Sequence, residues 1–162
     1  MPDTEQDCND YQSREFVSCA FSPKNEKQHV ITLTGEPDWL LLFWQWDKNK
    51  IIASINIGLT GSVPCNHFKC SFNPFDHNAV VVTGPNIYKY YKITNQQTEF
   101  TADHTQINNK DRSISTNYSS HAWMQDTGRL IICTEHGEIM LLETSGEYMA
   151  TINEAPGEGF KI

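Results

Sequence analysis

The feature that most constrains the fold is an apolar run at residues 39–46, in which Gln45 is the single polar side chain. Because polar and apolar residues do not alternate in this run, a strand formed from it needs both faces of its sheet covered. A buried helix is the alternative. The run is short for a helix, rich in aromatic residues and bounded by turn residues at 36–38 and 47–50. These features favour a central strand.

A pattern of about fifty residues occurs three times along the chain. Residues 19–23 (CAFSP) are echoed by 70–74 (CSFNP) and, more weakly, by 121–125 (HAWMQ). The aromatic positions Phe21, Phe72 and Trp123 are 51 residues apart each time (72 − 21 and 123 − 72). Each unit therefore begins with a strand that ends near its aromatic residue.

Three further strands are expected in every unit, because β-branched and apolar runs alternate there with polar turns. The second strands are predicted at 30–34, 80–83 and 130–134, the third at 39–46, 87–93 and 138–142, and the fourth at 51–57, 98–102 and 148–152. Four short strands per unit are typical of a propeller blade, and the dipeptide Trp46-Asp47 is the one that gives WD repeats their name.

We therefore predict an all-β fold, a partial WD-repeat β-propeller of about three four-stranded blades at 15–57, 65–102 and 118–153. Closed propellers have about four to eight blades, so this propeller is incomplete and two of its sheet faces are uncovered. We expect the chain to be a fragment, a short isoform or a piece that closes against another chain.

Three segments are predicted to lie outside the blades. Residues 1–14 form a polar leader, and residues 155–162 form a linker. Residues 103–117 form a polar insertion whose apolar residues are Ile107 and Ile114. Long loops of this kind are disordered, decorate the surface or bind a partner, and the composition favours one of the first two.

Composition excludes several functional classes. The net charge of −8 argues against binding to nucleic acid, which depends on clustered lysine and arginine. No apolar stretch is long enough for a membrane span, and the first fifteen residues lack the pattern of a signal peptide. Five cysteines are an odd number, and a disulfide framework is not expected. These observations predict a cytosolic protein.

A candidate metal site is the motif C-x-H-x-x-C at Cys65, His67 and Cys70. A structural zinc ion needs four ligands, and no partner cluster follows. Cys70 also occupies the repeat position of Cys19, which indicates a small core residue. We predict no metal and no cofactor.

A candidate acid–base cluster is Glu135-His136-Gly137-Glu138. A hairpin turn in which Gly137 supplies a positive φ explains it better. The sequence contains no nucleophile elbow and no glycine-rich phosphate loop. We therefore predict that the protein is not an enzyme, with no catalytic or cofactor-binding residues, and its binding residues are left open.

Tryptophan and lysine could each form a recognition surface. Trp39, Trp44, Trp46 and Trp123 fall within predicted strands, which favours packing in the core or between blades over exposure. Six of the lysines occur in pairs at turns or strand edges, where charge keeps an edge from pairing, although a small basic patch is an alternative. These pairs are Lys24 with Lys27, Lys48 with Lys50, and Lys89 with Lys92.

An ordered series of short segments resembles a known family. The segments are 16–23 (FVSCAFSP), 34–38 (TGEPD), 44–48 (WQWDK), 70–74 (CSFNP), 82–84 (VTG) and 121–123 (HAW). Together they resemble the WD-repeat region of the cilia- and flagella-associated protein fifty-seven family, also called WD-repeat protein sixty-five. The resemblance covers residues 15–154. The chain departs from the family in having few blades and no coiled-coil heptads.

The resemblance implies a non-catalytic scaffold of motile cilia that assembles or positions inner dynein arms near the regulatory complex of the axoneme. It implies axonemal proteins as partners, together with the remaining blades of a longer chain, and a location in the cytoplasm, cytoskeleton and ciliary axoneme. Neither a membrane nor a nucleic acid is an expected partner. A WD-repeat adaptor in another cytosolic complex is the alternative, and a propeller enzyme is a third, since fold alone does not fix function.

Overall fold

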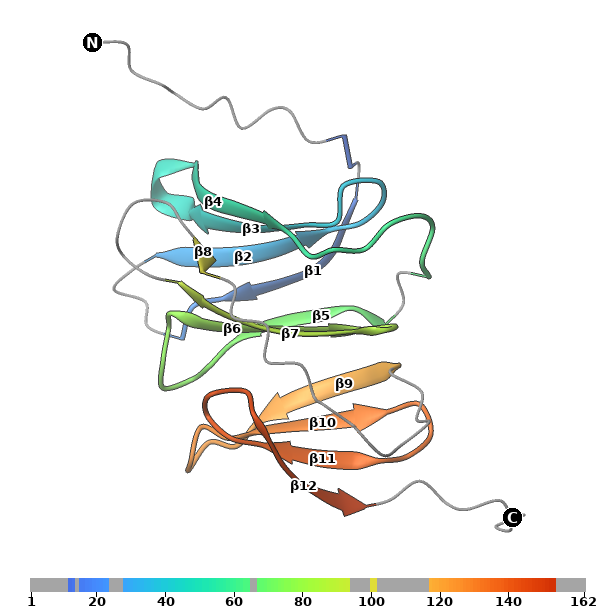
Figure 1. Ribbon diagram of the computed structural model, residues 1–162. Coiled ribbons are helices and arrows are strands. Elements are labelled where there is room, and N and C mark those ends of the chain that lie inside the picture. The colour runs from blue at the N-terminus through green and yellow to red at the C-terminus, as the bar shows by residue number, and fades with distance from the viewer. Residues whose placement is uncertain are drawn as a thin grey trace.

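The chain builds three four-stranded antiparallel sheets that are stacked face to face (Figure 1). The computed structural model describes residues 12–13, 15–23, 28–64, 67–93, 100–101 and 117–153. The predicted linker 155–162 and nearly all of the leader 1–14 and the insertion 103–117 lie outside these ranges. The predicted all-β class with three blade-like sheets is confirmed.

In every sheet the strands follow one another in chain order, each paired with the next. The first sheet contains β1 (Phe16–Phe21), β2 (His29–Thr34), β3 (Leu40–Gln45) and β4 (Lys50–Asn56). The second contains β5 (Lys69–Phe72), β6 (Ala79–Gly84), β7 (Ile87–Ile93) and β8 (Phe100–Thr101). The third contains β9 (Tyr118–Trp123), β10 (Leu130–Thr134), β11 (Ile139–Leu142) and β12 (Tyr148–Asn153).

The apolar run at 39–46 is the third strand of the first sheet, as predicted, but it is shorter at both ends. Trp39 has a positive φ of 49° and belongs to the turn that precedes β3. Trp46 begins a short 3-10 turn, η2 (Trp46–Lys48), which ends at Asn49 in the left-handed conformation. The chain must reverse direction at both ends of the run, and these turns take the two tryptophans out of the strand.

Two hydrophobic layers hold the sheets together. The first lies between the first and second sheets and contains Ile31, Leu41, Phe43 and Val82, among others. The second lies between the second and third sheets and contains Val81 and other residues. Because both of its faces are covered, β6 is buried along its whole length. This explains why its sequence, AVVVTG, shows no alternation of polar and apolar residues.

Strand β12 marks the opposite extreme, because its residues are exposed or half-buried throughout. It is the last strand of the third sheet, on the edge away from β9 (Figure 1). Within the described ranges, no helix has the length and apolar character needed to cross a membrane.

Candidate protein-interaction surfaces

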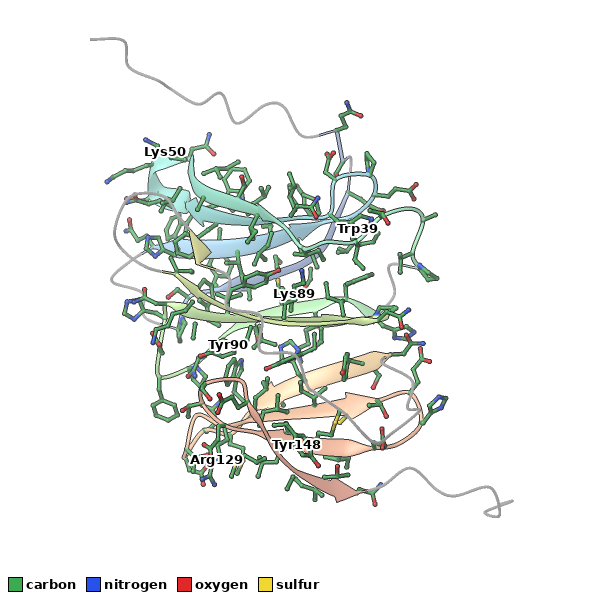
Figure 2. The ribbon with its side chains drawn as sticks, viewed as in Figure 1. Trp39, Lys50, Lys89, Tyr90, Arg129 and Tyr148 are labelled. Atoms are coloured by element: carbon green, nitrogen blue, oxygen red, sulfur yellow. The ribbon has the colours of Figure 1, made fainter. Side chains whose placement is uncertain are left out.

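Each sheet has a front face, which points toward the following sheet, and a rear face, which points toward the preceding one. Successive side chains along a strand point to opposite faces. Figure 2 shows this alternation on β7, where Lys89 points toward the first sheet and Tyr90 toward the third. Gly58, which follows β4 of the first sheet, lies beside the Lys89 ammonium. Tyr90 belongs to the second hydrophobic layer, which is defined by residues of the second and third sheets.

The rear face of the first sheet has no sheet against it among the described residues, and we call it the first end face. Every second residue of this sheet's strands, such as Ile31 and Phe43, points the other way, into the first hydrophobic layer. The alternating residues therefore point outward. Trp44 is half-buried there, and its Nε1–H donates to Thr32 Oγ1 at 2.8 Å. The outward residues include Cys19, Phe21, Val30, Thr32, Leu42 and Trp44, and of these Leu42 is buried.

The front face of the third sheet is likewise uncovered among the described residues, and we call it the second end face. Leu130, Ile132 and Leu142 point into the second hydrophobic layer, so the alternating residues point away from it. These residues are half-buried or exposed and largely apolar, and they are Ser120, Ala122, Ile131, Cys133, Ile139 and Leu141.

A polar network crosses the interface between the second and third sheets. His121 is 2% exposed, and its Nδ1 and Nε2 lie 2.7 Å from Thr83 Oγ1 and 2.6 Å from Ser71 Oγ. Trp123 Nε1–H donates to the same Ser71 Oγ at 2.8 Å. One assignment satisfies every group: the Ser71 hydroxyl donates to Nε2, and Nδ1–H donates to Thr83.

The His121 imidazole is neutral in this network. Burial, followed by the charge of Lys69, lowers its pKa to about 3. Lys69 Nζ also donates to the His121 carbonyl at 2.6 Å. A histidine with both nitrogens bonded and its charged form disfavoured is a structural group, and it has no nitrogen left for a metal or a substrate.

A cleft of about 540 Å³ opens on one rim of the stack, between the second and third sheets. We call it the rim cleft. Four segments line it: the turn between β5 and β6, strand β7, the turn between β9 and β10, and the turn between β11 and β12. The lining residues are Asn73, Phe75, Asp76, Tyr90, Lys92, Thr127, Gly128, Thr144, Ser145 and Glu147.

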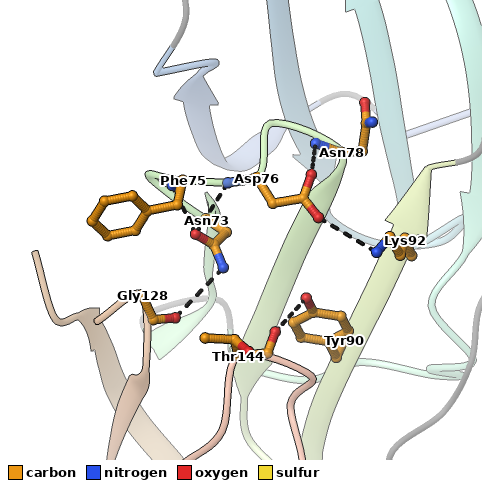
Figure 3. Close-up of polar contacts among 8 residues, drawn as sticks. All are labelled: Asn73, Phe75, Asp76, Asn78, Tyr90, Lys92, Gly128 and Thr144. Carbon is orange, nitrogen blue, oxygen red and sulfur yellow. Dashed lines mark hydrogen bonds and ion pairs between the residues drawn. The ribbon is translucent and has the colours of Figure 1, made fainter. Parts of the chain in front are cut away.

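Hydrogen bonds between the two sheets fix the shape of the rim cleft (Figure 3). The buried Asn73 amide accepts from the N–H groups of Phe75 (2.8 Å) and Asp76 (3.3 Å), and donates to the Gly128 carbonyl at 3.5 Å. Across the cleft, the Tyr90 hydroxyl donates to the Thr144 carbonyl at 2.7 Å. The turns of the third sheet are thus fastened to the second.

Both aromatic and charged groups face the rim cleft. The Phe75 ring is 55% exposed. Lys92 Nζ lies 3.6 Å from an Asp76 oxygen, and both side chains are partly exposed, so this pair contributes little to stability. Burial, followed by the Asp76 charge, raises the pKa of Tyr90 to about 12, which keeps its hydroxyl protonated and able to donate.

The candidate zinc motif does not come together. Cys65 lies outside the described residues, His67 is exposed and Cys70 is buried. The Cys70 thiol lies 3.4 Å from Ser18 Oγ, and burial raises its pKa to about 11, so it is a protonated core residue. Among the described residues, no three metal-ligating side chains gather into a site.

The segment 135–138 is the turn between β10 and β11, with Gly137 at a φ of 86°. The Glu138 N–H donates to Thr134 Oγ1 at 3.2 Å, and Asn117 Nδ2 donates to a Glu135 oxygen at 3.0 Å. The first contact closes the turn, and the second ties the turn to the residue that precedes β9.

The tryptophans divide between core and surface. Trp39 is fully buried and packs against Phe68, with ring centroids 4.9 Å apart, whereas Trp123 is half-buried against the second hydrophobic layer. Trp46 is exposed, which corrects the expectation that all four would pack inside, because η2 turns it out of the strand.

The described lysines do not gather into one patch. Lys48 and Lys50 flank the β3–β4 turn and are exposed, whereas Lys89 and Lys92 lie on β7. Burial lowers the pKa of Lys89, and Lys92 pairs with Asp76. Lys24 and Lys27 lie outside the described residues.

Comparison with known proteins finds similar ciliary and flagellar proteins. No family model matches the sequence. The chain is 31% identical over 156 residues to cilia- and flagella-associated protein 57 A of Tetrahymena thermophila, a match that covers 94% of this chain and 12% of that protein. It is 30% identical over 142 residues to cilia- and flagella-associated protein 57 of Mus musculus, covering 88% and 10%.

Among solved structures, the C-terminal WD40 domain of Sif2 matches with a TM-score of 0.56 and 14% identity, over 86% of this chain and 35% of that one. This likeness shows the fold. The chain spans about a tenth of the length of the curated relatives it matches. It is therefore similar to cilia- and flagella-associated protein 57 over about nine-tenths of its own length, and it has a WD40-type fold that forms an open, incomplete propeller.

Proposed function

We propose that this chain is part of a non-catalytic WD-repeat scaffold of motile cilia, which acts through protein–protein contacts and positions inner dynein arms. The observation that carries the proposal is the similarity to ciliary and flagellar proteins along nearly the whole chain. The rigid stack of sheets supports it, because propellers present loops on a fixed frame and so suit the recognition of several partners.

The two end faces are open and largely apolar among the described residues. We propose that sheets of the same kind cover them, as the neighbouring sheets cover each other within this chain. The equivalents of Phe21 support this: Phe72 in the second sheet and Trp123 in the third each pack against the preceding sheet. Burying such a side chain contributes about 1.5–3 kcal/mol.

The rim cleft is the place we propose for contact with a separate axonemal protein. Exposed aromatic residues in preformed hollows are typical anchors of protein interfaces, and Phe75 is such a residue. The net charge of −8 disfavours the acidic tails of tubulin as the partner. Subunits of the dynein arms or the regulatory complex suit this charge better.

The test is to express the tagged chain in a cell with motile cilia and to record where it accumulates. The proposal expects labelling along the axoneme that survives detergent extraction of the membrane. A diffuse cytosolic signal would instead support an adaptor of another cytosolic complex.

Two variants refine this test. Phe75→Ser should reduce axonemal labelling if the rim cleft carries a partner. The matched control is Trp46→Ser, which removes another exposed aromatic residue outside the cleft and should leave the labelling unchanged.

A further inference from the structure

We call the first strand of each sheet, β1, β5 and β9, its inner strand. Equivalent positions on the inner strands meet at both interfaces between sheets. At the first interface, the Cys70 N–H donates to Ser18 Oγ at 3.0 Å. At the second, Lys69 Nζ donates to the His121 carbonyl at 2.6 Å. Ser18 and Lys69 are 51 residues apart, as are Cys70 and His121. The front of one inner strand therefore meets the rear of the next in a fixed register.

The second interface is matched by polar residues on both sides. The front face of the second sheet supplies Ser71 and Thr83, and the rear face of the third supplies His121 and Trp123. Each hydroxyl bonds to a ring nitrogen, so neither side could lose its polar groups without leaving the other side unsatisfied.

The first interface carries apolar residues at the same positions. The register of each sheet identifies them: Leu33 pairs with Ser18 as Thr83 pairs with Lys69. The front face of the first sheet therefore has Ala20 and Leu33 where the second has Ser71 and Thr83. The rear face of the second sheet has Cys70 and Phe72 where the third has His121 and Trp123. Cys70, Phe72 and Leu33 are all buried.

The two end faces have apolar residues at these positions, as the first interface does. On the second end face, Ala122 and Cys133 stand at the positions of Ala20 and Leu33, because Cys133 pairs with Ser120. On the first end face, Cys19 and Phe21 stand at the positions of Cys70 and Phe72. The residue types at these positions of the two end faces therefore match those that meet at the first interface. Neither end face has, at these positions, the serine, threonine or histidine of the second interface.

We propose that the second end face of one copy of this chain binds the first end face of a second copy, head to tail, in the register of the first interface. This rests on the proposed function in one respect, namely that sheets of the same kind cover the end faces. Apolar surface leaving water drives the association, and the contact is heterologous, with different patches on the two copies.

A cysteine cross-link tests the register directly. Cys70 Sγ lies 3.4 Å from Ser18 Oγ, so cysteines at these two positions are close enough to join after a small movement. The equivalent positions across the proposed contact are Ser120 of one copy and Cys19 of the next. Ser120→Cys, oxidised in the full chain, should give covalent dimers joined through Cys19.

Two controls accompany the cross-link. Ser18→Cys should form the bond to Cys70 within one chain and leave the mass monomeric. Adding Cys19→Ser to Ser120→Cys should abolish the covalent dimers. Peptide mapping by mass spectrometry identifies the joined cysteines, since the chain contains five.

Sedimentation measures the association without the cross-link. The unmodified chain should form dimers or longer head-to-tail species as concentration rises, and Phe21→Lys should shift it to monomer. Phe75→Lys is the matched control, because that ring is also exposed but lies in the rim cleft rather than on an end face.

A chain that sediments as a monomer throughout, or a Ser120→Cys chain joined elsewhere than at Cys19, would overturn the proposal. Neither result would bear on axonemal labelling, which tests the proposed function separately.

Discussion

Phe21 and Phe72 occupy the same position in consecutive inner strands, yet Phe21 is 70% exposed and Phe72 is 5% exposed. Phe72 lies against the first sheet, where its ring meets that of Phe43 edge to face with centroids 6.1 Å apart. Phe21 has no sheet against it among the described residues. The difference comes from position in the stack, since the two strands have the same pattern.

The first prediction follows from this pair. Phe72→Ala should lower the free energy of unfolding by about 3–5 kcal/mol, because it leaves a cavity in the first hydrophobic layer. Phe21→Ala, measured at a concentration where the chain is monomeric, should change it by less than about 0.5 kcal/mol. Urea unfolding of both variants gives the comparison, and equal losses would show that Phe21 is covered.

The second prediction concerns two tryptophans. From the sequence alone, Trp44→Ala should cost about 3–5 kcal/mol if Trp44 packs between sheets. The structure places Trp44 on the first end face, so we expect a smaller loss of about 1–2 kcal/mol, mainly from its hydrogen bond and partial burial. Trp39→Ala should cost the full amount, because Trp39 is buried and packs on Phe68. Urea unfolding of both variants measures the two losses, and a larger loss for Trp44→Ala than for Trp39→Ala would contradict this prediction.

The repeat spacing predicted most of the fold. Aromatic residues 51 apart marked the inner strands, and the apolar runs marked the buried ones, because burial on both faces removes alternation from the sequence. The ends of the strand at 39–46 were wrong. Positive φ values at Trp39 and Asn49 close turns there, and nothing in the residue types of an apolar run signals such turns.

Less of the candidate sites could be predicted from the sequence. The rim cleft is built by turns that are far apart along the chain, such as those at Phe75 and Ser145, and spacing alone does not say that they meet. The polar network at His121 gave one signal, which is that a histidine replaces cysteine at this repeat position. Its partners Ser71 and Thr83 lie in another unit and became identifiable only from the register.

The third prediction concerns Gly146, in the turn between β11 and β12. Its φ is 86°, and a Cβ added there would lie 2.7 Å from the Tyr90 ring. Gly146→Ala should therefore lower the free energy of unfolding by more than about 1 kcal/mol through backbone strain and the clash. Gly61→Ala is the control, since its φ is 79° but a Cβ there would meet nothing within 4 Å. If both variants lose the same stability, strain alone accounts for the effect and the close packing on Tyr90 does not.

The last prediction is a pH dependence of stability that arises from His121. Its pKa is about 3 in the folded chain, against an ordinary value of 6.5, so the unfolded chain binds a proton that the folded one excludes. The stabilising contribution is complete above pH 6.5 and is lost as the pH falls toward 3. Between pH 7.5 and pH 5 the loss should be about 2 kcal/mol. His121→Gln has an amide that can still bond to a hydroxyl but cannot titrate, so its urea midpoint should fall less over this range. His67→Gln, at an exposed position, should follow the unmodified chain. A His121→Gln profile parallel to that of the unmodified chain would show that another group controls the acid sensitivity.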